Sequence, residues 1–163
     1  MSLTQIQLNQ WTTASAGYRR WERKVYLGSG ETLWERSCDA LLHWEIKTRS
    51  GFAVTGQPRV AIGAHPELRV RLGPMSIDEP IEVVDVIEES SRVGFAYKTL
   101  SGHPVSGEEA FILVREQAGI FLVIRSLTAP SDRLRWRIIF PLLLLAQKYT
   151  RRRYATALLR EPS

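Results

Sequence analysis

The chain has 163 residues, 44% of them hydrophobic and 24% charged, so it can bury a core without the help of a disulfide or a metal. Its single cysteine, Cys38, excludes an internal disulfide, and its longest apolar run, Ile138–Ala146, is far shorter than the ~20 residues that span a membrane. The net charge of +5 is unevenly placed, because residues 133–163 hold eight bases and one acid while residues 1–132 are slightly acidic.

The first third of the chain is predicted to hold one strand and one helix within a single domain that covers residues 1–163. Residues 1–17 are polar and are expected to be loosely structured. They contain no apolar signal segment, which makes a cytoplasmic location the default expectation. Alternation predicts a strand over Trp21–Leu27, and apolar residues at spacings of three and four predict a helix over Glu31–Lys47.

After Gly51 the hydrophobic period changes from 3.6 residues to two, which is typical of strands. The further strands are predicted at Phe52–Thr55, Arg59–Gly63, Leu68–Leu72, Ile81–Glu88, Arg92–Leu100, Glu108–Arg115 and Ile120–Leu127. Short connections rich in Gly and Pro separate most of them, and such connections favour an antiparallel meander over parallel pairing.

The last predicted element is a long helix from about Leu134 to Leu159. Pro141 lies inside this segment, and it is expected to kink the helix or to split it after a short first piece. Periodicity thus predicts an antiparallel α+β domain of about seven strands with a C-terminal helix.

The segment Gly94–Phe111 resembles the signature of the domain-of-unknown-function 1990 family, also called uncharacterised protein family 0548, which has no established activity. Weaker matches lie at Gly17-Tyr18, Leu27–Glu31, Ala40–Trp44, Pro58–Gly63, Arg152–Tyr154 and Ala157-Leu158. The chain departs from the family at Lys98, where we expect a glycine. With the order of the elements, the resemblance implies the helix-grip fold of the START-like superfamily, in which a curved antiparallel sheet wraps a long C-terminal helix.

This fold-level analogy implies a pocket that binds a small hydrophobic or amphipathic ligand without covalent chemistry. Alternation places Tyr97 on the bulky face of its strand, where its hydroxyl needs a partner if it is buried. Arg125 interrupts an apolar strand, and it is either exposed on the outer face or an anion anchor inside the pocket. The predicted ligand-binding residues are Phe95, Tyr97, Phe111, Phe121, Arg125 and Phe140.

His103 and Glu109, in and beside a turn-rich loop, are predicted to lie at the pocket rim or to serve only the loop. An alternative function makes one of them the acid–base group of an enzyme. The spacing matches no metal-ligand motif, and the chain has neither a nucleophile elbow nor a phosphate-binding glycine loop, so no catalytic residue, cofactor or metal is predicted. Cys38 falls on the apolar side of its helix and is expected to be a buried structural residue.

The basic end of the chain supports a second alternative. Lys148, Arg151, Arg152 and Arg153 cluster on the last helix, downstream of an apolar run. This pattern is typical of a core helix with a solvated basic end, and also of a helix that associates with an anionic membrane surface. Nucleic acid is disfavoured as a partner, because only Tyr149 and Tyr154 are interleaved with the basic residues.

Overall fold

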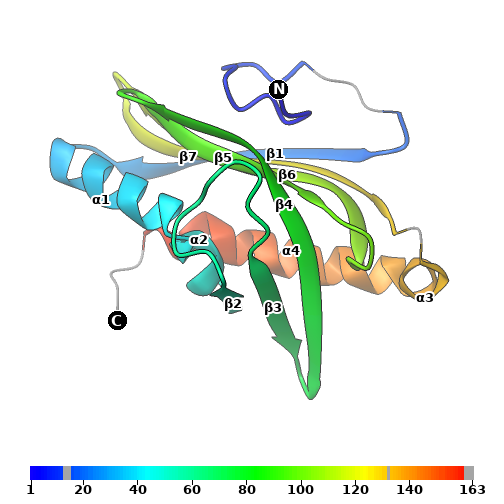
Figure 1. The fold of residues 1–163 in the computed structure, drawn as a ribbon. Coiled ribbons are helices and arrows are strands. Elements are labelled where there is room, and N and C mark those ends of the chain that lie inside the picture. The colour runs from blue at the N-terminus through cyan, green and yellow to red at the C-terminus, as the bar shows by residue number, and fades with distance from the viewer. Residues whose placement is uncertain (13–15, 132, 160–163) are drawn as a thin grey trace.

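The computed structural model describes residues 1–12, 16–131 and 133–159, which form one curved antiparallel sheet and four helices (Figure 1). The strands are β1 Arg19–Gly28, β2 Phe52–Thr55, β3 Glu67–Leu72, β4 Met75–Glu89, β5 Arg92–Thr99, β6 Val105–Glu116 and β7 Gly119–Pro130. The helices are α1 Glu31–Leu42, α2 Glu45–Thr48, α3 Leu134–Ile138 and α4 Phe140–Ala157.

The seven strands follow the spatial order β1-β7-β6-β5-β4-β3-β2. Strands β2 to β7 therefore pair in sequence order, as expected for neighbours joined by short connections, and β1 closes the edge beside β7. Helix α4 runs along one face of the sheet, and α1 and α2 cover one end of that same face (Figure 1). The predicted α+β class and helix-grip architecture are confirmed.

One predicted strand is wrong. Residues 59–63 form an irregular segment in which the Val60 amide donates to the Leu42 carbonyl at the end of α1, and the Gly63 amide donates to the Val83 carbonyl of β4. Val60 is buried but its next two neighbours are exposed, so the segment has no strand alternation. Conversely, β4 begins at Met75 rather than Ile81, because residues 75–80 pair with β3 in an extended hairpin.

The predicted first helix is broken at His43 and Trp44. Trp44 adopts a positive φ of 65°, which ends α1 and starts the short α2 in a new direction. Its ring is buried and meets Phe95 edge-on, with ring centres 5.1 Å apart. The break matters for the site, because it turns Lys47 of α2 into the interior.

The C-terminal helix is split, as one alternative for Pro141 predicted. Pro141 lies in the first turn of α4, where its missing N–H has no intrahelical partner to lose. The preceding residues form α3, which stands nearly end-on in the view that shows α4 lengthwise (Figure 1).

Residues 1–12, here called the N-terminal strap, lie on the outer face of the sheet, opposite α4 (Figure 1). Asp85 accepts a hydrogen bond from the Ser2 amide at 2.9 Å, and Glu108 accepts one from the Thr4 amide at 2.7 Å. Two side chains of the strap, Ile6 and Trp11, are buried between the strap and the outer face of the sheet. The expected loose structure is therefore wrong for residues 1–12, while Thr13, Ala14 and Ser15 lie outside the described residues.

Cys38 is half-buried on α1, and burial is the main cause that raises the pKa of its thiol to about 11. Because the thiolate is the reactive form, we expect iodoacetamide to modify native Cys38 at pH 8 at least about ten-fold more slowly than the thiol of the denatured chain. Alkylation followed by intact-mass spectrometry measures both rates. Equal rates would contradict the buried setting.

Candidate functional site

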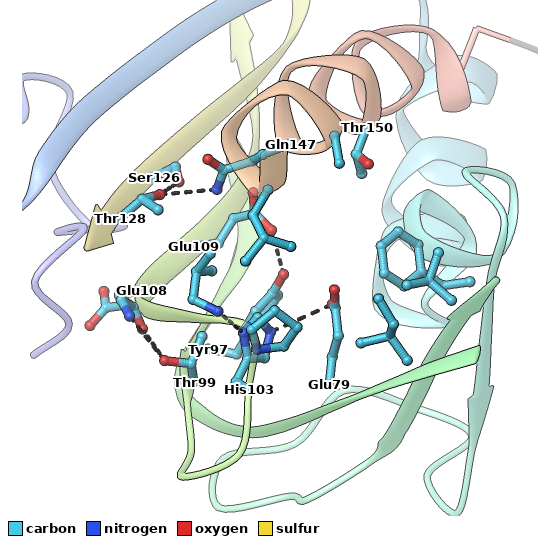
Figure 2. A pocket seen from close by; sticks show the side chains of 18 of the residues that line it. Glu79, Tyr97, Thr99, His103, Glu108, Glu109, Ser126, Thr128, Gln147 and Thr150 are labelled. Atoms are coloured by element: carbon cyan, nitrogen blue, oxygen red, sulfur yellow. Dashed lines mark hydrogen bonds and ion pairs between the residues drawn. The ribbon is translucent and has the colours of Figure 1, made fainter. Parts of the chain in front are cut away.

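A cavity with a solvent-accessible volume of about 100 Å³ lies between the inner face of the sheet and α4 (Figure 2). Its apolar lining residues are Phe52, Val70, Ile77, Pro104, Val105, Leu127, Leu143 and Ala146. Its polar lining residues include Lys47, Glu79, Tyr97, Thr99, His103, Glu109, Ser126, Thr128, Gln147, Thr150 and Tyr154. The cavity therefore has a mixed lining, with apolar side chains over much of its wall and polar side chains over the rest.

Lys47 is the centre of the polar wall, and only 1% of it is exposed. Its Nζ donates to the Tyr154 hydroxyl at 2.6 Å, to the Tyr97 hydroxyl, and to Glu109 Oε2 at 3.3 Å. These three acceptors use all three ammonium donors. Tyr97 and Glu109 are direct cross-strand partners on β5 and β6, and the Tyr97 hydroxyl donates to Glu109 Oε2. We call these four residues the Lys47 cluster.

Aromatic rings surround the same ammonium group. The ring centres of Phe52, Tyr97 and Tyr154 each lie 4.7 Å from Lys47 Nζ, and that of Phe111 lies 5.5 Å away. Rings at these distances attract a cation through their electron-rich faces. Together with Glu109, they offset the cost of taking a charge out of water.

Both tyrosines of the cluster keep their protons at neutral pH. The pKa of Tyr97 and that of Tyr154 lie well above the ordinary value, first because burial disfavours the phenolate and second because Glu109 carries a nearby negative charge. The two hydroxyls are therefore hydrogen-bond donors and acceptors in the cavity wall.

A second titratable pair faces the cavity from another side. His103 is buried, and its Nε2 lies 3.6 Å from Glu79 Oε2 (Figure 2). The Val105 amide donates to Nδ1 at 3.1 Å, which leaves the ring proton on Nε2, facing Glu79. Burial would raise the pKa of Glu79, but the interaction with His103 and the positive charge of Lys47 outweigh it and lower that pKa.

The α4 side of the cavity offers an unused hydrogen-bond acceptor. Gln147 Nε2 donates to the Thr128 hydroxyl of β7 at 3.0 Å (Figure 2). Its other amide atom, Oε1, is buried and has no hydrogen-bond partner among the described residues. A buried acceptor without a partner is costly, and a donor group on a bound molecule would satisfy it.

The structure brings only part of the predicted ligand set to the cavity. Tyr97 lines it, and so do His103 and Glu109, which lie in its wall rather than at a rim. Phe95 and Phe111 are fully buried in the core beneath it, with ring centres 5.6 Å apart, and are not lining residues. Phe140 lies partly exposed at the start of α4 and is not a lining residue either.

Phe121 and Arg125 lie on the opposite face of the sheet from the cavity. Phe121 meets Tyr26 edge-on at 5.4 Å, and Lys24 Nζ lies over its ring. The prediction that these two residues line the pocket is wrong, because the β7 residues that reach the cavity are Ser126, Leu127 and Thr128.

Arg125 fits neither setting proposed for it, since it is on the outer face but only 1% exposed. Its guanidinium donates to the carbonyls of Thr4, Gln5, Leu8 and Asn9 at 2.7–3.1 Å, and its Nε donates to Glu22 at 2.6 Å. All five N–H donors of the side chain are thus engaged. Arg125 anchors the N-terminal strap.

The predicted basic surface is divided. Lys148 and Arg152 are exposed, whereas Arg151 turns toward the sheet, where it donates to the Ser126 hydroxyl at 2.9 Å and lies 4.3 Å from the ring centre of Trp21. Arg153 is partly buried. Lys98, the departure from the family pattern, is exposed and forms an ion pair with Glu82 at 2.7 Å, so it does not enter the cavity.

The sequence reasoning missed Lys47, Glu79, Tyr154 and Gln147. Lys47 was predicted only as the last residue of a helix, and Glu79 fell outside every predicted strand and helix. Among the residues that the structure describes, no three His, Cys, Asp or Glu side chains gather in a way that could hold a metal ion.

Comparison with known proteins places this architecture in a family. The model of the domain of unknown function DUF1990 matches residues 3–157. A UPF0548 protein of Deinococcus radiodurans is 32% identical over 156 residues, which cover 87% of this chain and 77% of that protein.

Solved structures with little sequence identity share the fold. A hypothetical protein of Helicobacter pylori has a TM-score of 0.60 at 8% identity, over 87% of this chain and 85% of that one. The Zhui aromatase/cyclase of a Streptomyces species has a TM-score of 0.60 at 14% identity, over 87% and 92%. A major latex-like protein of Panax ginseng has a TM-score of 0.53 at 9% identity, over 89% and 100%. These likenesses show the fold alone, whereas the family match covers nearly the whole chain, and the chain therefore belongs to the DUF1990 (UPF0548) family.

Proposed function

We propose that the cavity binds a small amphipathic molecule without covalent chemistry. The observation that carries this proposal is the mixed lining of the cavity, in which the Lys47 cluster and the His103–Glu79 pair face the same space as apolar side chains from the sheet and from α4, among them Phe52, Val70, Ile77, Leu143 and Ala146. A molecule with one polar and one apolar end would satisfy Gln147 Oε1 or the titratable pair and also cover the apolar wall.

The volume limits the ligand. About 100 Å³ holds several water molecules or a small organic group, whereas pockets for drug-sized ligands measure ~300–1,000 Å³. The α4 wall is loosely packed, however, since none of residues 140–153, all of them described, is fully buried. A small outward shift of the first turns of α4 would enlarge the cavity and leave the buried Tyr154 in place.

Native mass spectrometry of protein purified without detergent tests the proposal. We expect an additional mass that disappears on denaturation and is recovered as one class of compound. Leu143→Trp should abolish it, because Leu143 lines the cavity, while Leu142→Trp, on the exposed side of the same helix, should leave it unchanged. A wild-type spectrum free of additional mass, or equal loss in both variants, would contradict ligand binding in this cavity.

A second candidate function, acid–base catalysis, is favoured by the His103–Glu79 pair in the wall of the same cavity. A buried titratable pair with a perturbed pKa in the wall of a ligand space marks a candidate catalytic site, and in this pair the lowered pKa of Glu79 keeps its carboxylate ionised beside His103. If His103 moves a proton during a reaction, His103→Asn should retain a compound that differs in mass or isomeric form from the one recovered with the wild-type protein. Recovery of the same compound from both proteins would contradict catalysis by His103.

A further inference from the structure

Helices α3 and α4 both expose large apolar side chains. Each is between 63% and 70% exposed, and we call the set the α3–α4 face: Leu134, Ile138, Leu142, Leu145 and Tyr149. Leu142, Leu145 and Tyr149 are three and four residues apart and share one face of α4, and Leu134 and Ile138, four residues apart, share one face of α3. Exposed apolar residues are ordinary when scattered singly, but several on one helical face mark an interaction surface.

The α3–α4 face is separate from the cavity. Leu143, Ala146, Gln147 and Thr150, which line the cavity, lie on the inner side of α4. Helix α4 is therefore apolar on two sides in its first half, and the core uses only one of them. The exposed apolar side chains on the other side of α4 are not buried by any other part of the described chain.

Exposed bases flank the face, and α3 and α4 themselves contain no acid. Arg133, Arg135, Arg137, Lys148 and Arg152 are exposed, and residues 133–159 contain no Asp or Glu. This set differs from the basic surface predicted from the sequence, since it loses the inward-turned Arg151 and the partly buried Arg153 and gains three arginines around α3.

We propose that the α3–α4 face docks on an anionic membrane surface. The apolar side chains would enter the boundary between headgroups and acyl chains, and the bases would lie near lipid phosphates. Charge argues against a second copy of the chain as the occupant, because pairing two such faces would bring like charges together. No helix in the described part of the chain has the length and apolar character needed to cross a bilayer. A helix that lies on the membrane surface does not need to cross the bilayer.

The test is co-sedimentation of the full chain with vesicles of phosphatidylcholine that contain phosphatidylglycerol. At low salt we expect binding that weakens at least about ten-fold with pure phosphatidylcholine vesicles or at high salt, since each base near the surface contributes to the attraction. Arg135→Gln/Arg137→Gln/Lys148→Gln should weaken binding by about ten- to one-hundred-fold. The apolar variant Leu142→Glu/Leu145→Glu should weaken it comparably.

Matched controls separate this face from general charge and stickiness. Arg19→Gln/Arg23→Gln/Arg71→Gln removes as many exposed bases from β1 and β3, and Ile62→Glu changes an apolar residue that is 67% exposed elsewhere. Both should bind like the wild type. Absence of binding to anionic vesicles, equal losses in the controls, or a dimer in sedimentation velocity that Leu142→Glu/Leu145→Glu dissociates would overturn the proposal. Circular dichroism checks that each variant is folded.

Discussion

Replacing Lys47 by Met is expected to lower the free energy of unfolding by about 3–5 kcal/mol, because the change removes one partner of a buried ion pair and leaves the other charged. Glu109 would lose its contact with Nζ, and the hydroxyls of Tyr97 and Tyr154 would lose a donor. Methionine fills a similar volume, so the loss reports mainly on charge and hydrogen bonding. Urea denaturation followed by circular dichroism measures it.

Two further variants isolate the cause. Lys47→Met/Glu109→Gln removes both charges, and we expect it to be more stable than Lys47→Met alone, since no carboxylate is left without its counter-charge. Lys98→Met breaks a half-exposed pair with Glu82 and should cost no more than about 1 kcal/mol. If Lys47→Met lowers the free energy of unfolding as little as Lys98→Met does, the ion pair and hydrogen bonds of Lys47 do not stabilise the fold.

Much of the fold followed from local patterns. The expected strand Phe52–Thr55 matches β2 residue for residue, and the expected strand Arg92–Leu100 differs from β5 by one residue. Alternation with turn residues is a strong signal in a meander, because each strand pairs with the next and one face is buried. The strand predicted at 59–63 was wrong because this segment does not pair with a neighbouring strand. Its residues make only single hydrogen bonds to α1 and β4.

The site was harder to predict, because its key residues break the usual rules of burial. Lysine is almost never fully buried unless paired, and nothing near Lys47 in the sequence announces partners 50 and 107 residues away. Those partners meet it only because α1 ends at Leu42 and α2 takes a new direction. A sequence without an alignment of relatives contains no signal for that meeting.

The inner and outer faces of β7 show a different limit. Alternation places Phe121 and Arg125 on the same face of β7, four residues apart, but it does not tell which face is the inner one. The N-terminal strap covers the outer face, so Val123 and Arg125 are buried there while Leu122 and Ile124 are buried on the inner one. When both faces of a strand are covered, its residues read as a continuous apolar run, and the pattern no longer assigns an orientation.

Gly107→Ala is expected to lower the free energy of unfolding by more than about 3 kcal/mol, because strained backbone and steric overlap act together. Gly107 has a φ of +152°, and a Cβ there would lie 1.8 Å from the Leu127 carbonyl oxygen and 2.8 Å from its carbon. Both atoms belong to the backbone of the neighbouring strand, so neither can move without opening β6 from β7. Thermal and urea unfolding of the purified variant measure the loss.

Gly102→Ala is the matched control in the same hairpin. Gly102 also has a positive φ, +97°, but a Cβ there would meet nothing closer than 3.9 Å. Its replacement should therefore cost only the backbone strain, about 1–2 kcal/mol. The difference between the two variants is the contribution of the close contact between β6 and β7, and equal losses would show that this contact relaxes freely.

The contact also positions the cavity wall. The ladder of backbone pairs between β5 and β6 ends before Gly107. There the Thr99 hydroxyl of β5 accepts a hydrogen bond from the Gly107 amide at 2.9 Å, in place of a backbone carbonyl. The next two residues then point to opposite faces, with Glu108 bound to the N-terminal strap and Glu109 in the Lys47 cluster. If Gly107→Ala opens this end of β6, both carboxylates move, and the additional mass in native spectra should be lost from Gly107→Ala yet retained by Gly102→Ala. Retention of that mass by both variants would show that the ligand does not depend on the position of Glu109.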